Sequence, residues 1–219
     1  SDVPLDDPKI IASGPLSYDE VKISLDKYED DITDKLNSVK PVNCPDINNF
    51  SNIKTHVIAK LNDAKKACKA QGEKLKYKTF VHEKFIEGDV NTLANYFSGY
   101  LNSCEKGLHI WGGESSVNLP ENPGRGGRNQ QLALLMAEKI KNKDILFLSA
   151  GTDGTDGPTN DAGGLVDGNT INFGSKYNLD HKMHLQNADS GNYLEKSKSL
   201  VTTGPTGTNV MDLILAIKK

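Results

Sequence analysis

Glycine is distributed unevenly along this chain, and that distribution constrains the fold more than any other feature. Residues 107–219 contain 16 of the 20 glycines, whereas residues 1–106 contain 4. Many glycines of the second half lie beside Asp, Thr, Asn or Arg, where predicted strands or helices end. Backbone without a Cβ can turn sharply and approach a ligand closely. We therefore expect the functional site in the second half.

The apolar residues alternate between the periods of strands and helices, which predicts a layered α/β fold with a mixed, largely parallel sheet. Residues 18–54 are less regular and indicate a helix followed by a loop. Asp89 can cap one helix, and Gly72 can end another. The predicted strands are 55–59, 77–83, 108–111, 115–119, 144–150, 163–166, 199–203 and 213–217, and the predicted helices are 63–71, 89–104 and 128–141.

Composition excludes several classes of protein. The 26 Lys and Arg against 29 Asp and Glu give a net charge of −3 without a long run of one sign, so a nucleic-acid partner is not expected. The longest apolar runs have about five residues, far below the roughly 20 of a membrane-spanning helix. The odd number and the spacing of Cys44, Cys68 and Cys104 suggest neither a disulfide framework nor a zinc site, which favours the cytoplasm. A start at Ser1 without Met indicates a fragment or a processed chain.

The first glycine-rich loop runs from Gly124 to Gln130 and precedes the predicted helix at 128–141. Free N–H groups at a helix N-terminus favour an anion, and Gly126 and Gly127 would let it approach. Arg125 and Arg128 are the only arginines, beside 24 lysines, which points to the bidentate fork that suits carboxylate and phosphate. The alternative is a tight turn with solvent-exposed arginines.

The second loop, residues 151–164, follows a predicted strand, where α/β sheets place their ligands. Asp153, Asp156 and Asp161 could ligate Mg²⁺, or one of them could act as a base toward a hydroxyl. Asp153 is the strongest candidate of the three. The alternative is a series of Asx turns.

Two further loops, residues 111–116 and 203–209, offer backbone donors, hydroxyls and one strong polar side chain each, Glu114 and Asn209. Each is weak evidence alone, since such sequences usually form only turns. The five histidines lie outside all four loops and are interpreted as surface or core residues. The common glycine motifs for ATP and dinucleotides, G-x-x-x-x-G-K-[ST] and G-x-G-x-x-G, do not occur.

The chain contains, in order, the motifs Ser1-Asp2-Val3-Pro4 with residues 6–8 and 11–15, Gly112-Gly113-Glu114, 124–130, 149–154 and 203–210. In this order they resemble the glycerate 2-kinase family, and the last three resemble its C-terminal MOFRL domain. Members are about twice as long as this chain. The resemblance implies that residues 1–54 are the tail of a Rossmann-like amino-terminal domain with a linker, and that 55–219 form an α/β region with the MOFRL domain at about 105–219.

The resemblance implies transfer of the γ-phosphoryl of ATP to the 2-hydroxyl of D-glycerate, with Mg²⁺ or another divalent cation, in a cleft between two domains. Arg128 would stabilise the phosphoryl group or hold the glycerate carboxylate. Asp153 would ligate the metal, together with Asp156, or orient the hydroxyl. The implied substrate- or nucleotide-binding residues are Asp2, Gly112, Gly113, Glu114, Arg125, Gly126, Gly127, Asn129, Thr208 and Asn209.

By the same resemblance, the catalytic lysine lies in the amino-terminal half, so this chain alone is expected to be inactive. Two alternatives stay open: an NAD(P)H-dependent hydroxypyruvate reductase, a label often attached to this family, and a non-catalytic module that binds glycerate or phosphate. A homodimer is compatible with the sequence.

Overall fold

The computed structural model describes residues 1–3, 6–14, 17–18, 34–35, 38 and 46–219. The chain divides into two units, Leu5–Ile58 and a larger one made of Ser1–Pro4 with Ala59–Lys219. In the smaller unit, the described residues include two short 3-10 helices, η2 (Ile11–Ser13) and η3 (Ile47–Phe50). The helix and loop predicted for 18–54 fall mostly outside the described residues.

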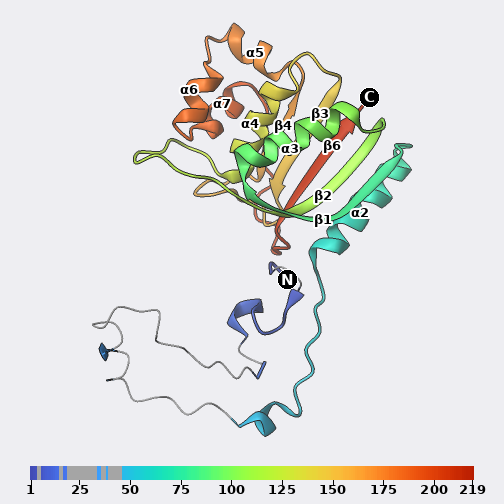
Figure 1. Cartoon of the computed structure of the whole chain (residues 1–219), viewed down its shortest axis with the longest axis vertical. Coiled ribbons are helices and arrows are strands. Elements are labelled where there is room, and N and C mark those ends of the chain that lie inside the picture. Colours follow the sequence, from blue (N-terminus) through green and yellow to red (C-terminus); the bar gives the residue numbers. More distant parts are fainter. Residues whose placement is uncertain (4–5, 15–16, 19–33, 36–37, 39–45) are drawn as a thin grey trace. The chain divides into compact units, whose positions relative to one another are not determined.

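The larger unit is built on a six-stranded sheet with the order β1-β2-β6-β3-β4-β5 (Figure 1). The predicted α/β class is confirmed. The strands are β1 (Thr79–Asp89), β2 (Gly107–Ser116), β3 (Ile145–Gly151), β4 (Gly163–Asp167), β5 (Leu200–Val201) and β6 (Asp212–Lys218). The helices are α2 (Leu61–Lys74), α3 (Val90–Ser103), α4 (Arg128–Lys139), α5 (Thr170–Lys176), α6 (His181–Gln186) and α7 (Ser190–Lys196).

The prediction of a largely parallel sheet is wrong. Only β1 and β2 pair in parallel, and the other four pairings between named strands are antiparallel. β1, β2 and β3 do run in one direction, as the helical crossovers through α3 and α4 favour. β6 lies between β2 and β3 and runs the opposite way, which makes both of its pairings antiparallel.

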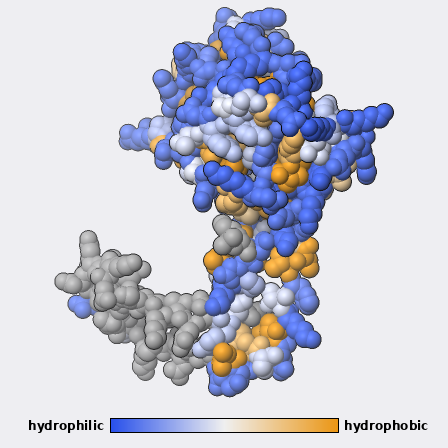
Figure 2. Space-filling view, turned by 45° about the vertical axis from the view of Figure 1, so that its right-hand side comes forward, coloured by the Kyte–Doolittle hydropathy of each residue, from blue (hydrophilic) through white to orange (hydrophobic). Residues whose placement is uncertain are grey.

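The main core lies between the sheet and the helices α3 and α4. Successive residues of β2 point to opposite faces, so Trp111 packs against Phe97 of α3 while Gly112 faces Leu61 of α2. The helix α2 therefore covers the other face of the sheet at β1 and β2. Figure 2 shows that the visible surface of the larger unit is mainly hydrophilic, with apolar side chains in separate small groups.

Local signals predicted most elements of the larger unit. Asp89 caps α3 by accepting a hydrogen bond from the Asn91 N–H at 2.8 Å, as expected. Gly72 does not end a helix, because α2 continues to Lys74. Gly72 instead packs against the side chains of Leu108 and Thr79, where a Cβ would not fit.

The strand predicted at 55–59 is absent, since residues 53–60 contain neither helix nor strand. Of the strand predicted at 115–119, only Ser115 and Ser116 are extended, as the end of β2, and residues 117–119 form no strand. Cys68 and Cys104 are free thiols, and Cys44 lies outside the described residues. In the described part of the chain, every helix is too short or too polar to cross a membrane.

Candidate active site

The candidate site lies at the end of the sheet where the inner strands β2 and β3 end and β6 begins. Asp212, the first residue of β6, is in register with Gly113 of β2 on one side and Gly151 of β3 on the other. The helix α4 begins nearby, since the Arg128 side chain reaches Asp212. Strand order thus brings together three of the four glycine-rich loops.

Arg128 is held by two carboxylates at this end of the sheet. Its Nε donates to Asp212 Oδ2 at 2.8 Å and its Nη2 to Oδ1 at 3.1 Å, a bidentate contact. Its Nη1 lies 3.0 Å from Glu114 Oε1. The hydrogen bonds that Arg128 donates to Asp212 raise the pKa of Arg128, so the guanidinium stays protonated. The sequence predicts a carboxylate or phosphate anion for this fork, and in the structure the fork contacts the carboxylate of Asp212.

Asp212 is not among the site residues that the sequence predicts. Its side chain is 2% exposed although it is an acid at the start of an otherwise apolar strand. Lone buried acids are rare unless they are paired. An isolated Asp beside a buried apolar run was therefore the signal that could have found it.

Asp156 occupies the anion position that was predicted at the N-terminus of α4. Its Oδ1 accepts from the Asn129 N–H at 3.0 Å and its Oδ2 from the Gln130 N–H at 2.8 Å. Burial raises the pKa of Asp156 to about 6, against the effect of these donors. Gly127 lies against Asp156 and has no room for a Cβ. The helix N-terminus is thus already capped, and both Asp156 oxygens face the helix.

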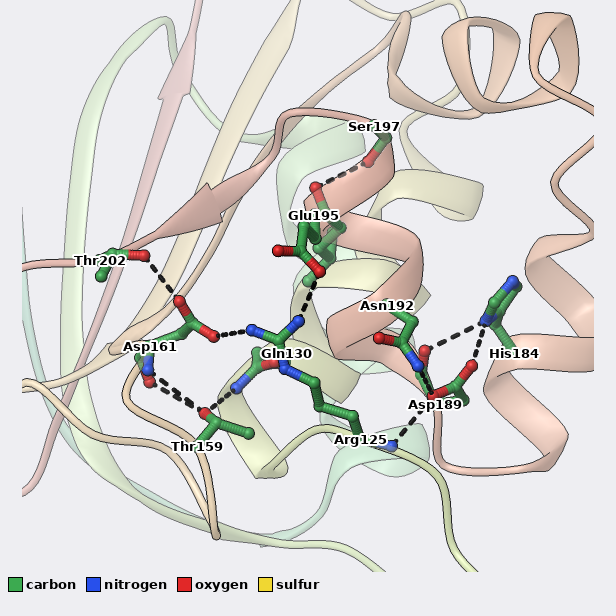
Figure 3. A network of polar contacts seen from close by, with 11 residues as sticks. Arg125, Gln130, Thr159, Asp161, His184, Asp189, Asn192, Glu195, Ser197 and Thr202 are labelled. Carbon is green, nitrogen blue, oxygen red and sulfur yellow. Dashed lines mark hydrogen bonds and ion pairs between the residues drawn. The ribbon is translucent and has the colours of Figure 1, made fainter.

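Arg125 joins the first glycine-rich loop to two other segments (Figure 3). Its Nη2 lies 2.5 Å from Asp161 Oδ2, and its Nη1 lies 2.6 Å from Glu195 Oε2 of α7. Asp161 also accepts from Thr202 Oγ1 at 2.6 Å. Both acids bind protein groups, which gives Arg125 and Asp161 an evident structural use.

Asp189 fixes the same loop from the junction of α6 and α7 (Figure 3). Its Oδ1 accepts from the Arg125 N–H at 2.9 Å and from Asn192 Nδ2 at 2.7 Å. His184 Nδ1 lies 2.8 Å from its Oδ2. Asp189 directly precedes α7, but its side chain makes no capping bond to that helix. It anchors the loop instead.

Asp153 lies on the second loop, which packs against the fourth. The Thr206 N–H donates to the Asp153 carbonyl at 3.1 Å, and Thr206 Oγ1 to the Thr152 carbonyl at 2.6 Å. Asp153 Oδ1 accepts from the Thr155 N–H at 3.0 Å. A Cβ placed on Gly151 would lie 3.0 Å from Asp153 Oδ1 and 3.7 Å from Asp212 Oδ1. Asp153 therefore lies at the same end of the sheet as Arg128.

The remaining predicted residues lie in different places. Asn129 is buried, where its Oδ1 accepts from Ser149 Oγ at 2.6 Å. Asn209 Oδ1 accepts from the Met211 N–H at 2.9 Å and shapes the turn before β6, while Thr208 is exposed. Asp2 is exposed, and the described contacts do not link it to Arg128.

Three predicted glycines have packing roles. Gly112 contacts Leu61 of α2, and Gly113 lies against the backbone of Ile86 in β1. A Cβ on Gly126 would lie 2.6 Å from Ser190 Oγ. These contacts explain the absence of side chains without a ligand.

A hollow of about 310 Å³ opens beside Arg128. This is the small end of the range for ligand pockets. Its lining includes Ser115, Ser116, Gly126, Gly127, Arg128 and Pro158.

The described residues contain no group of three or more His, Cys, Asp or Glu placed to hold a metal ion. Mg²⁺ usually needs only one or two carboxylates, with substrate phosphates and water completing its shell. Asp153 fits that arrangement because it is partly exposed at the same end of the sheet as Arg128. Asp156 does not fit, because its oxygens bind the N-terminus of α4.

Comparison with known proteins identifies the class first: residues 107–212 match the MOFRL family. Across 99% of its length, the chain is 36% identical to D-glycerate 2-kinase of Thermotoga maritima and 29% identical to glycerate 2-kinase of Pyrococcus horikoshii. Residues 107–212 therefore belong to the MOFRL family, and nearly the whole chain is similar to glycerate 2-kinases.

The structural comparison agrees with this assignment. The crystal structure of glycerate kinase from Thermotoga maritima matches with a TM-score of 0.82 at 29% identity, covering 100% of this chain and 56% of that one. The chain covers 55% of the Thermotoga maritima relative and 54% of the Pyrococcus horikoshii relative. It therefore spans about half the length of these curated relatives.

Proposed function

We propose that this chain is the C-terminal part of a kinase that transfers the γ-phosphoryl group of ATP to D-glycerate and forms 2-phosphoglycerate. The observation that carries the proposal is Arg128, fixed by Asp212 beside a small hollow. The relationship to D-glycerate 2-kinase over 99% of the chain supports it. The bond between ADP and the γ-phosphorus breaks as the bond to the 2-hydroxyl oxygen forms, and the hydroxyl proton leaves to a base.

Phosphoryl transfer depends mainly on positioning and on stabilising charge. The Arg128 guanidinium would bind the transferring phosphoryl group or the glycerate carboxylate, both of which suit its planar fork. Asp153 would orient the 2-hydroxyl or hold the divalent cation. When bound, Mg²⁺ would neutralise charge on the phosphates.

The other half of the reaction centre would come from an amino-terminal domain that completes the cleft and carries the catalytic lysine. We accordingly expect the 219-residue chain alone to be inactive. A cytoplasmic enzyme, with a homodimer as one compatible state, agrees with the composition.

The test is a coupled kinase assay of the complete protein with ATP, Mg²⁺ and D-glycerate, in which the product is identified as 2- or 3-phosphoglycerate. We expect 2-phosphoglycerate. Asp144→Asn serves as a control variant that should keep the wild-type activity, because the Asp144 side chain is exposed and pairs only loosely with Lys219 at 4.0 Å. Oxidation of NADH with hydroxypyruvate, without kinase activity, would contradict the proposal. Glycerate binding without turnover would indicate a binding module.

A further inference from the structure

The two carboxylates that hold Arg128 differ in burial and in geometry. Asp212 contacts two nitrogens of the guanidinium, and its side chain is 2% exposed. Glu114 contacts one nitrogen, and its side chain is 45% exposed. One partner is thus anchored within the fold, whereas the other lies on its surface.

Together these three groups carry one positive and two negative charges, so the cluster repels an arriving anion unless one carboxylate leaves. Removing a buried carboxylate from its arginine would leave an uncompensated buried charge, which is strongly unfavourable. An exposed ion pair contributes only slightly to stability, because water replaces it readily. Glu114 is therefore the partner that can leave.

We infer that Glu114 is the exchangeable counter-ion of Arg128, displaced by an oxyanion of the substrate while Asp212 keeps the guanidinium in place. Asp212 is then a positioning residue. The oxyanion is a carboxylate or a phosphoryl group, and its identification with glycerate or ATP rests on the proposed function. A hollow of about 310 Å³ that Arg128 helps to line adjoins this cluster.

The small number of arginines makes this exchange measurable by NMR. Arg125 and Arg128 are the only two in the chain, so labelling arginine with ¹⁵N gives two Nε–H signals, which Arg125→Lys assigns. Inorganic phosphate and D-glycerate are titrated separately into the 219-residue chain. The anion that shifts the Arg128 signal shows whether the site takes a phosphoryl group or a carboxylate.

Glu114→Gln should bind the same anion about two- to fivefold more tightly, because the competing charge is gone. The Nε–H proton of Arg128 should remain as protected from exchange as before. Asp144→Asn, which also removes one exposed negative charge, should bind as the wild type does. Unchanged or weaker binding by Glu114→Gln would overturn the inference.

Asp212→Asn separates a positioning role from a purely electrostatic one, because the two change the affinity for the anion in opposite directions. Loss of one negative charge alone would tighten anion binding. Loss of positioning should weaken it about tenfold, since a released guanidinium must be ordered again, and should make the Nε–H proton exchange rapidly. Tighter binding by Asp212→Asn would refute the role of Asp212.

If Asp212→Asn does not fold, the Arg128 Nε–H signal of the wild-type protein still tests the role of Asp212. The Nε–H proton must stay protected at saturating anion, because Asp212 and not Glu114 holds that nitrogen. Its loss of protection, or the failure of both anions to bind the chain and the complete protein, would overturn the inference. Anion exchange at Arg128 without kinase activity would refute only the proposed function.

Discussion

Asp156→Asn should change how the stability of this protein depends on pH. Asp156 is 3% exposed, and its carboxylate accepts hydrogen bonds from the first turn of α4. Burial raises the pKa of Asp156 from 3.8 to about 6. Because an amide does not titrate in this range, the substitution removes this one ionisation while keeping the size of the side chain.

The direction of this pKa shift determines whether the contribution of Asp156 to stability rises or falls with pH. Between pH 4 and 6 the folded state binds more protons at Asp156 than the unfolded state does, so its contribution falls as the pH rises. That contribution is complete below about pH 4 and is lost as the pH passes about 6. A shift of about two pKa units corresponds to about 3 kcal/mol of unfolding free energy.

Urea unfolding of both proteins at pH 4, 5, 6 and 7 measures this effect. The difference between their unfolding free energies should move by about 3 kcal/mol in favour of Asp156→Asn from pH 4 to pH 7. The amide leaves one N–H of α4 without an acceptor, but that cost does not depend on pH. A constant difference, or one that favours the wild type at higher pH, would refute the reasoning and show that the helix donors outweigh burial.

Three further predictions address other parts of the larger unit. Burial lowers the pKa of His82 to about 4, and its ring stacks on that of Trp111, the single tryptophan, with 4.3 Å between the ring centroids. Tryptophan emission should therefore fall on acidification with a midpoint near pH 4, and His82→Phe should abolish that step. An unchanged titration would contradict the contact. Gly191→Ala should destabilise the protein by more than about 1 kcal/mol, because the added Cβ would lie 2.9 Å from a backbone oxygen. Gly99→Ala should stabilise it by about 0.5–1 kcal/mol, because Gly99 lies inside α3 with open space around it. Equal effects of the two substitutions in thermal melts would count against this packing. Arg128→Lys in the complete enzyme should lower kcat/KM by at least the equivalent of ~1.5 kcal/mol, and an unchanged value would exclude a bidentate role.

Features that depend on neighbouring residues could be predicted from the sequence. The cap of α3 at Asp89 and the start of α4 at Arg128 both follow local rules and were found. The position of β6 could not be found in this way. Its apolar pattern predicts a strand, but its insertion between β2 and β3 is set by contacts far apart in sequence.

The candidate site shows the same difference between local signals and contacts that are far apart in sequence. The use of arginine at Arg128 predicts a bidentate contact with a carboxylate or phosphate group, but it does not identify Asp212, the partner in the structure, which is 84 residues away. Glycine at Gly113 could equally indicate a ligand or tight packing, and only the position of β1 beside it reveals the packing. The sequence thus indicates which side chains can bind an anion, but not which residues of the protein they contact.

The place of β6 in the sheet also affects how the chain folds as it is synthesised. β2 and β3 emerge from the ribosome well before β6, yet β6 is the strand that joins them. Until then, each has an unpaired edge, which is a template for pairing with other chains. The nascent protein must therefore keep the unpaired edges of two largely apolar strands apart from other chains while the segment between Gly151 and Asp212 is translated.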